Sequence, residues 1–233
     1  MLKRNLLVLA SVLIYSNASH AIAISSLFEA ADPKTHSADV IIENNDGKDM
    51  FINIEMAKVD YIDGKKVVTK VDKDNFKDWT FSVNPTQIVL KPNERKTIRL
   101  HNKCADKECK LKKDKVYAVD VTPVPYVNGK ASAVAVAFGY RVYFMDPATQ
   151  VDLKYKIKRV SKDQIMFVNN SNTMLRAIFN ACTTEYNSDC IYDYRVLSGS
   201  TKKFKLPKTL INKKVLKVNI INANEEINES ISI

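Results

Sequence analysis

The sequence predicts an all-β protein that is built from two β-sandwiches. Helical periodicity is almost absent, whereas short apolar or alternating runs recur at close intervals. Nearly every run ends at a cluster of Asn, Asp, Gly or Pro, which are residues that favour turns. Near the middle of the chain, Asp146-Pro147 ends one such run before a second series begins. Many short strands punctuated in this way are typical of sandwiches.

The N-terminal residues have the pattern of a secretory signal peptide. Two basic residues precede an apolar run at Leu6–Tyr15, and a segment rich in small residues follows it. The small residues allow cleavage after Ala21 or Ala23, so residues 1–21 are expected to be removed on export. An apolar run of roughly ten residues is too short to span a bilayer. We therefore expect an exported protein that does not insert into membranes.

The first predicted sandwich comprises residues 22–147. Its expected strands lead into turn chemistry such as Asn84-Pro85 and Asn128-Gly129. These strands are Val40–Glu43, Phe51–Tyr61, Phe81–Val83, Gln87–Leu90, Thr97–His101 and Val116–Tyr126. Ile22–Phe28 is expected to add a first strand to the same sandwich.

The last predicted strand of this half, within residues 131–147, has two chemically different faces. One face carries larger apolar side chains, those of Val134, Val136, Phe138 and Tyr140. The opposite face carries only Ala and Gly until Arg141 interrupts it. Such an apolar ladder is either a core strand or an edge that binds another surface.

Residues 148–233 show the same pattern of short apolar runs that end at turn residues, and they form the second predicted sandwich. The expected strands are Asp152–Val160, Gln164–Val168, Leu175–Cys182, Tyr192–Val196, Lys202–Leu206 and Val215–Ile221. The mature chain of about 210 residues could also form one continuous sandwich, because single β-domains of that size occur. The turn at Asp146-Pro147 favours two sandwiches joined by a short hinge.

Four cysteines form two close pairs in the sequence. Cys104 and Cys109 enclose one short loop, and Cys182 and Cys190 enclose another. In an exported chain such pairs predict local disulfides, although four cysteines allow three connectivities. Closing so short a loop stabilises a fold by about 2 kcal/mol in the chain-entropy model. The spacing is wider than in four-cysteine zinc sites, so no metal is expected.

Charge and composition exclude several classes of function. The formal net charge is +10, and it is +8 without the two basic residues of the signal peptide. The lysines are spread along the chain, so nucleic acid is not an expected partner. His36 and His101 are the histidines beyond the signal peptide, and neither belongs to a metal-binding or Ser-His-Asp pattern. With no Gly-rich phosphate loop either, we expect no enzyme and no cofactor.

An ordered series of short motifs runs along the mature chain. The motifs are Phe81-Ser-Val-Asn-Pro85, Ile88-Val-Leu-Lys-Pro92, Lys96-Thr-Ile-Arg-Leu100, Tyr140–Pro147, Ile165–Asn172 and Leu197–Ser200 followed by Phe204. Taken in order, they resemble the signature of periplasmic pilus-assembly chaperones of the chaperone–usher pathway. The cysteine-bearing second half is similar to the divergent, alternative branch of that family.

The resemblance implies two immunoglobulin-like sandwiches at an angle and a periplasmic chaperone that binds pilus or fimbrial subunits. Such a chaperone donates a strand to a subunit that lacks one. The resemblance assigns the donated strand to the apolar ladder at Val134, Val136, Phe138 and Tyr140. An outer-membrane usher is the other expected partner. The exposed edge could also pair with a second copy in a self-capping dimer.

The resemblance also implies a basic residue that holds the terminal carboxylate of the subunit. Arg141 is assigned this role, because arginine binds carboxylates through strong and often bidentate hydrogen bonds. The family's second basic residue has no counterpart in the first strand, since Ile24–Ala31 contains no Lys or Arg. Arg99 is the alternative second anchor.

Two other functions fit an exported β-sandwich. A fimbrial subunit or adhesin would carry an N-terminal extension of alternating apolar residues that completes a neighbour, and Ile22–Phe28 is short for that purpose. A carbohydrate-binding module would need an aromatic platform. Trp79, with Phe76 and Phe81 nearby, is the nearest candidate, but packing in a core or at a domain edge is the better explanation of a lone Trp in a sandwich.

Overall fold

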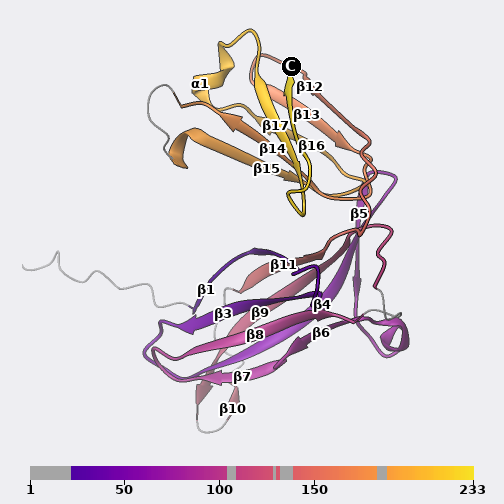
Figure 1. Cartoon of the computed structure of the whole chain (residues 1–233). Helices are drawn as coiled ribbons and strands as arrows, with labels where there is room; N and C mark the ends of the chain where they lie inside the picture. Colours follow the sequence, from indigo (N-terminus) through magenta and orange to yellow (C-terminus); the bar gives the residue numbers. More distant parts are fainter. Residues whose placement is uncertain (1–21, 104–108, 128–129, 132–138, 183–187) are drawn as a thin grey trace, which may run out of the picture.

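The computed structural model describes residues 22–103, 109–127, 130–131, 139–182 and 188–233. They form two β-sandwiches, which Figure 1 shows as two lobes inclined to each other and joined at one side. The predicted fold class, an all-β protein of two immunoglobulin-like sandwiches at an angle, is confirmed. Within these ranges, helical structure is limited to α1 (Lys208–Ile211) and the 3₁₀ turns Phe76–Asp78 and Ser188–Cys190. None of it is long and apolar enough to cross a membrane.

The N-terminal sandwich packs two sheets of different size, which we call the β3 sheet and the β9 sheet. The β3 sheet has the order β1 (Ile22–Ile24), β3 (Ser37–Asn44), β8 (Arg95–Asn102) and β6 (Phe81–Asn84). The β9 sheet has the order β2 (Phe28–Ala30), β11 (Tyr140–Asp146), β9 (Lys115–Val127), β4 (Met50–Ile62) and β5 (Lys65–Lys70). In addition, β4 pairs with β7 (Gln87–Leu90) and β9 pairs with β10 (Lys130–Ala131).

Alternating side chains build the core of this sandwich. Each of five strands places two buried residues between the sheets, namely Val40 and Ile42, Ile52 and Ile54, Ile98 and Leu100, Val119 and Val121, and Val142 and Phe144. The spacing of two follows from the pleat of a strand, which turns successive side chains to opposite faces. Fully burying one such side chain contributes roughly 1.5–3 kcal/mol.

The C-terminal sandwich is smaller and has its own core. One sheet has the order β12 (Tyr155–Arg159), β13 (Gln164–Asn169) and β16 (Thr201–Lys205). The other has the order β15 (Ile191–Val196), β14 (Leu175–Asn180), β17 (Lys217–Asn222) and β18 (Asn228–Ser232). The buried residues between them include Ile165, Phe167, Leu175, Phe179, Val218 and Ile220.

A buried asparagine closes one corner of the N-terminal sandwich. Nδ2 of Asn44, at the end of β3, donates to the backbone oxygens of Lys48 (2.8 Å) and Leu90 (3.0 Å). Its Oδ1 accepts from the backbone N–H of Asp46 at 2.9 Å. The backbone oxygen of Asn44 accepts from the N–H of Asn93, a turn residue with a φ of 60°. The side chain and backbone of Asn44 therefore join the loop after β3 to the turn between β7 and β8.

The C-terminal sandwich repeats this corner. Nδ2 of Asn169, at the end of β13, donates to the backbone oxygens of Thr173 (2.9 Å) and Val196 (2.8 Å). Its Oδ1 accepts from the backbone N–H of Ser171 at 2.9 Å. Its backbone oxygen accepts from Gly199, a turn residue with a φ of 77°. The two halves thus share an internal structural repeat around a buried asparagine.

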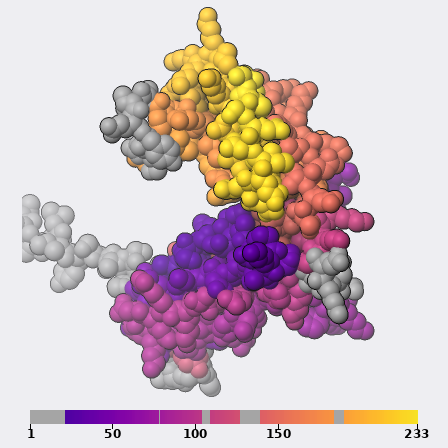
Figure 2. All heavy atoms as spheres, in the orientation of Figure 1, coloured from indigo at the N-terminus to yellow at the C-terminus, as the bar shows by residue number. Residues whose placement is uncertain are grey.

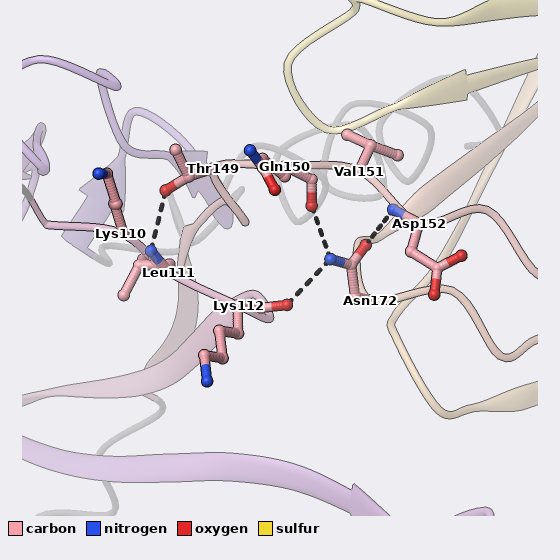
Figure 3. Close-up of a pocket in the computed structure, with 8 residues that line it drawn as sticks. All are labelled: Lys110, Leu111, Lys112, Thr149, Gln150, Val151, Asp152 and Asn172. Atoms are coloured by element: carbon pink, nitrogen blue, oxygen red, sulfur yellow. Dashed lines mark hydrogen bonds between the residues drawn. The ribbon is translucent and has the colours of Figure 1, made fainter.

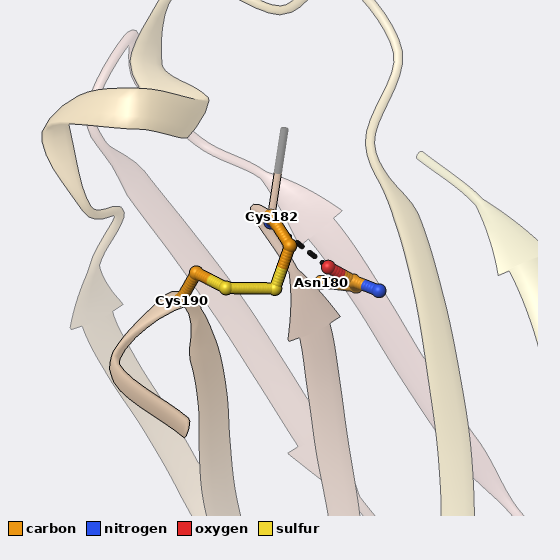
Figure 4. Close-up of a disulfide and its surroundings, with 3 residues drawn as sticks. All are labelled: Asn180, Cys182 and Cys190. Atoms are coloured by element: carbon orange, nitrogen blue, oxygen red, sulfur yellow. Dashed lines mark hydrogen bonds between the residues drawn. A yellow bond between two sulfur atoms is a disulfide. The ribbon is translucent and has the colours of Figure 1, made fainter. Parts of the chain in front are cut away.

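The predicted Cys182–Cys190 disulfide is present (Figure 4). It joins the segment after β14 to the start of β15, and these two strands pair with each other. Oδ1 of Asn180 accepts from the backbone N–H of Cys182 at 2.9 Å. Cys109 is also disulfide-bonded, but its predicted partner, Cys104, lies outside the described residues.

Candidate functional site

The predicted donor strand falls mostly outside the described part of the chain. Val134, Val136 and Phe138 belong to the stretch that the structure does not describe. Tyr140 begins β11 and packs against the core of its own sandwich. Its hydroxyl donates to the backbone oxygen of Ile22 at 3.1 Å. From Tyr140 onward, the predicted apolar face is therefore turned toward the sandwich interior.

β11 has one fully paired edge and one partly paired edge. On one side it pairs antiparallel with β9 from Tyr140 to Asp146. On the other side β2 pairs with it in parallel, from Tyr143 to Met145. The N–H of Tyr143 there donates to the backbone oxygen of Leu27 at 2.9 Å. Before Tyr143, no strand in the described ranges pairs with this side of β11.

The backbone of Arg141 points to this open side. Alternate residues of a strand direct their backbone groups to the same side, so Arg141 shares the direction of Tyr143. The chain that precedes β2 has by then crossed to the β3 sheet, where the N–H of Ser25 donates to the backbone oxygen of Ile41 at 3.0 Å. Unpaired backbone groups along an edge are a template for an added strand. The start of β11 thus offers the backbone geometry that strand addition requires.

Gly139, directly before β11, lies where two stretches of backbone come very close. A Cβ at this position would stand 2.6 Å from the backbone oxygen of Val121 and 3.3 Å from Cα of Thr122. These atoms belong to the backbone of β9 and cannot move aside like a flexible side chain. Glycine inside a strand often marks a bulge or such a close approach. The position therefore admits only glycine without a shift of the strands.

Arg141 lies on the outer face of the β9 sheet and binds Asp120 of β9. Its Nε and Nη2 donate to the two carboxylate oxygens at 2.5 and 2.6 Å. Arg141 and Asp120 are opposite each other in a non-hydrogen-bonded pair of the antiparallel ladder, and in such pairs the facing side chains come closest. Hydrogen bonding to Asp120 raises the pKa of the Arg141 guanidinium. The Arg141 side chain is 43% exposed, so a carboxylate from solution can reach it.

Arg99 lies on the other sheet, so the structure does not bring the two predicted anchors together. It points outward from β8, between the buried residues Ile98 and Leu100. Its Nε and Nη2 each donate to one oxygen of Asp39 at 2.9 Å. Hydrogen bonding within this pair lowers the pKa of Asp39 and raises that of Arg99.

The outer face of the β9 sheet meets the C-terminal sandwich at one end. Met174, from the loop before β14, is buried there among residues of β4, β9 and β11, which are Ala57, Val59, Val116, Ala118 and Met145. Burying a methionine side chain contributes about 1.5–3 kcal/mol. Side-chain packing, and not only the linker, therefore joins the two sandwiches.

Tyr143 lies across the same outer face and reaches β5. Its hydroxyl accepts a hydrogen bond from Nζ of Lys66 at 2.7 Å, and Nζ also stands 5.0 Å from the centre of the Tyr143 ring. The row across the sheet from Tyr143 contains Ala118 and Ala57 before it reaches Lys70 of β5, and Lys66 lies four residues before Lys70 on that strand. These small side chains leave room for the tyrosine ring to lie along the sheet.

Arg195 of β15 reaches from the C-terminal sandwich to the N-terminal one. Its guanidinium lies 5.0 Å from the ring centre of Phe28 on β2, within the range of a cation–π interaction. Oδ2 of Asp193 is 3.8 Å away, but that oxygen already accepts from Arg176 at 2.8 Å. Figure 2 shows a hollow between the two sandwiches on one side of the molecule. Through its contact with Phe28, Arg195 places positive charge where the two sandwiches meet.

Sequence reasoning did not identify Lys66 or Arg195. Both are exposed strand residues among other charged side chains, and no motif marks them. The signal that identifies them is spatial, because each contacts an aromatic ring that the fold brings to the boundary between the sandwiches.

A groove of about 470 Å³ lies on the connection between the sandwiches (Figure 3). Segments 110–112 and 149–152 form its walls together with Asn172. Nδ2 of Asn172 donates to the backbone oxygens of Lys112 (2.9 Å) and Gln150 (2.7 Å). Because these polar groups are used in holding the connection together, we assign the groove to the hinge and not to a ligand.

One set of side chains in the described ranges has a spacing that could suit a metal ion. It consists of His36, Cys109 and Asp146. Cys109 is disulfide-bonded, and metal ions bind thiolates. The buried Asp146 carboxylate instead contacts Nδ1 of His36 at 2.9 Å and accepts from Nδ2 of Asn102 at 2.6 Å. These contacts fasten the end of β11 to the β3 sheet.

Trp79 takes part in the core and not in an exposed aromatic platform. Its ring is partly buried against the N-terminal core and meets the ring of Tyr117 edge-on, with centres 5.8 Å apart. Phe81 stacks on the same tyrosine, with ring centres 4.3 Å apart. Packing therefore explains Trp79, Tyr117 and Phe81, whereas Phe76 is 69% exposed.

Solved structures with this fold come from pilus chaperones and their complexes. A chain of the CsuC–CsuE chaperone–tip adhesion subunit complex from archaic chaperone–usher Csu pili of Acinetobacter baumannii is similar at a TM-score of 0.54 and 15% identity, over 91% of this chain and 98% of that one. The class 5 fimbriae chaperone CfaA has a TM-score of 0.51 at 17% identity, over 91% and 97%. The E. coli chaperone DraB has 0.53 at 10%, over 92% and 96%. The chain thus has the fold of the pilus chaperones.

The sequence also places the chain in a family. Residues 24–147, more than half of the chain, match the model of the CS5 fimbrial protein N-terminal domain. The chain therefore belongs to this family, and the resemblance to pilus-assembly chaperones that its motifs indicate is confirmed. A comparison with curated protein sequences finds no match.

Proposed function

We propose that this chain is a periplasmic chaperone of pilus subunits. It binds a subunit by donor-strand complementation, keeps it stable and delivers it to an outer-membrane usher. The fold of its structural relatives and its fimbrial family support a role in pilus assembly. No catalytic step and no cofactor form part of the proposal.

The partly paired edge of β11 is the observation that carries the proposal. An added strand needs free backbone groups along an edge, and the start of β11 offers them. Directly before it in the sequence, Val134, Val136 and Phe138 alternate with alanines and would fill apolar sites of a subunit. Tyr140 would mark the end of this ladder, because its ring turns into its own sandwich. Gly139 would separate this ladder from the rest of β11.

We further propose that residues 1–21 are a signal peptide, with cleavage after Ala21 or Ala23. The first described strand is Ile22–Ile24, so cleavage after Ala21 would leave it whole, whereas cleavage after Ala23 would remove two of its three residues. The mature protein would then work in the periplasm as two domains, 22–147 and 148–233. The last strand of the β9 sheet ends at Asp146, and the next strand begins at Tyr155.

The terminal carboxylate of a bound subunit would be held on the outer face of the β9 sheet. Arg141 offers a guanidinium there, but Asp120 already binds two of its N–H groups, so an incoming carboxylate must share or displace Asp120. Lys66 and Arg195 are the candidates for a second anchor. In the described structure neither forms a bidentate carboxylate pair, and both lie at the boundary between the sandwiches, unlike Arg99.

Periplasmic co-expression with candidate pilus subunits tests the proposal. The wild-type chain is expected to yield a stable one-to-one complex. Val136→Asp and Phe138→Asp are each expected to abolish it while the variant stays folded, because an apolar groove does not accept a charge. Val68→Asp, at an exposed position of the opposite edge strand β5, is the matched control and should leave the complex intact. Wild-type yields of complex with both ladder variants would sink the assignment.

A fimbrial subunit is the second candidate function, because it also fits an exported β-sandwich and because the matching family model is named for a fimbrial protein. The position of β1 argues against it, because Ile22 pairs with Asn44 of β3 inside the same sandwich. The N-terminal segment thus completes its own fold, whereas a subunit offers such a segment to a neighbour. Polymers formed by the purified chain alone would favour this second candidate.

A further inference from the structure

A buried carboxylate joins the two sandwiches. Asp114, just before β9, is only 7% exposed. Its Oδ1 accepts from the N–H of Ala148 in the linker at 2.8 Å, and its Oδ2 accepts from the N–H of Met174 at 2.5 Å and from the hydroxyl of Thr173 at 3.3 Å. The N–H of Asp114 donates to the backbone oxygen of Asn172 at 3.0 Å. One residue therefore ties the N-terminal sandwich to the linker and to the loop between β13 and β14.

The ionisable groups around Asp114 do not compensate its charge. The described ion pairs include no cation bound to its carboxylate. Its ionisable neighbours are Asp60 and Tyr61 at the end of β4, Lys113 beside it in the chain, and Asp146 at the end of β11, which itself contacts His36. The C-terminal loops present Thr173, Met174, Leu197 and Ser198, which carry no charge.

Burial dominates the protonation of this carboxyl. Desolvation raises the pKa of Asp114 to about 6, although the hydrogen bonds from Ala148, Met174 and Thr173 favour the ionised form. The negative charge of Asp146 adds to the rise. An ionised Asp114 is thus disfavoured while the connection is closed and favoured once water reaches it.

We propose that Asp114 is a positioning residue that holds the two sandwiches at their relative angle and makes the closed connection weaken as pH rises. The inference goes beyond the proposed function, and only its consequence for subunit capture rests on that function. A change of angle would separate the cationic groups of the C-terminal half, such as Arg195, from the outer face of the β9 sheet.

The direction of the effect follows from proton binding. Between the ordinary pKa of 3.8 and about 6, the closed connection binds a proton that the opened one has lost. Opening is therefore suppressed below about pH 4 and becomes easier until the pH exceeds about 6. A difference of roughly two pK units corresponds to at most about a hundredfold change in the opening equilibrium.

Hydrogen exchange at the Met174 amide tests this on the isolated full chain. After correction for the intrinsic exchange rate, its protection factor is expected to fall about ten- to hundredfold between pH 4.5 and pH 7. The amides of Val119 and Ala177, in central strands of the two sandwiches, should change much less. A protection factor at Met174 that does not vary with pH, or an equal change at all three amides, would overturn the proposal.

Two variants separate the carboxyl from general effects of pH. Asp114→Asn cannot ionise, so the pH dependence at Met174 should disappear, whereas Asp60→Asn should keep it. Thr173→Val keeps the carboxyl but removes one hydrogen bond that favours its ionised form, so the transition should move to higher pH. If the protection factor at Met174 varies with pH in Asp114→Asn as it does in the wild type, the proposal is contradicted. If Asp114→Asn does not fold, Thr173→Val decides, and an unchanged transition pH in that variant contradicts the proposal. These results stand whether or not the chain captures subunits.

Discussion

Asn44 and Asn169 are single residues on which the shape of each sandwich depends. Each fully buried amide satisfies two backbone oxygens and one backbone N–H from separate segments. An alanine at either position would leave these groups without partners in a place that water does not reach. An unsatisfied buried polar group costs about 1–3 kcal/mol. These two positions are therefore the polar residues that we expect to tolerate substitution least.

Asn169→Ala is expected to lower the free energy of unfolding by about 2–4 kcal/mol, because it leaves buried backbone groups unpaired. Urea unfolding followed by circular dichroism measures the loss. Asn228→Ala, at an exposed position of the edge strand β18, is the control and should have little effect. Equal losses of stability for the two variants would show that the hydrogen bonds of the buried Asn169 side chain do not stabilise the sandwich.

Arg141 and Arg99 form a matched pair for testing the carboxylate anchor. Each binds one aspartate of a neighbouring strand with two hydrogen bonds, but they lie on different sheets. Arg141→Ala is expected to weaken subunit binding about tenfold or more, since hydrogen bonds to charged groups contribute about 1.5–3 kcal/mol. The stability of the free chain should fall by at most about 1 kcal/mol, because exposed ion pairs contribute little.

Isothermal titration calorimetry with a purified subunit measures the affinity of both variants. Arg99→Ala should bind the subunit with wild-type affinity. If Arg99→Ala loses binding and Arg141→Ala keeps it, the carboxylate anchor lies on the β3 sheet and not on the β9 sheet. Lys66→Ala and Arg195→Ala identify the second anchor. The variant that lacks this anchor should bind the subunit more weakly.

At the residue scale, the sequence identifies Arg141 as a candidate binding residue but does not predict what it contacts. Arg141 stands out because it interrupts a face of Ala and Gly. Its partner Asp120 lies on another strand, and only the register between β9 and β11 brings the two together. Asp114 is not marked by the sequence at all, because its role depends on contacts with residues about sixty positions away in the chain.

Two edges of the β9 sheet differ in how they are protected. The edge strand β5 is short and carries three lysines, which discourages other strands from pairing with it. The start of β11 has no such protection and directs the backbone of Arg141 outward. This contrast supports β11, and not β5, as the edge that meets a partner.

Gly139→Ala tests the close approach of the segment before β11 to β9. A methyl group there would meet the backbone of Val121, so we expect a loss of stability of about 1–3 kcal/mol and weaker subunit binding. Gly47→Ala is the matched control, because a Cβ at Gly47 meets nothing within 4 Å. Thermal unfolding measures the loss, and a Gly139→Ala variant as stable as Gly47→Ala would contradict the close approach.

At the element scale, periodicity predicts the strands that pack against a core. Ile98 and Leu100, or Val119 and Val121, show the alternation that marks β8 and β9. Periodicity does not predict β5 and β18. All residues of β5 are exposed, β18 places only Ile231 against the C-terminal core, and no apolar alternation marks either strand. The turn at Asp146-Pro147 correctly indicates where the β9 sheet ends.

At the scale of the whole molecule, the relation of the two sandwiches depends on few residues. Met174 packs into the outer face of the β9 sheet, and Asp114 and Asn172 bind the linker and the facing loops. Nothing in the local sequence around these residues indicates that they meet, since each belongs to a different turn. The family resemblance implies that the sandwiches are inclined, but the contacts that hold them so, and with them the hollow in Figure 2, could not be predicted from the local sequence.

Hydrogen exchange at Arg141 tests the central claim most directly. In the free chain the N–H of Arg141 faces the open side of β11, and in a purified complex it should bond to a strand of the subunit. We expect its exchange to slow strongly in the complex, while the amides of β5, at the opposite edge of the sheet, keep their free rates. If Arg141 exchanges as fast in the complex as in the free chain, the subunit does not add a strand to this edge.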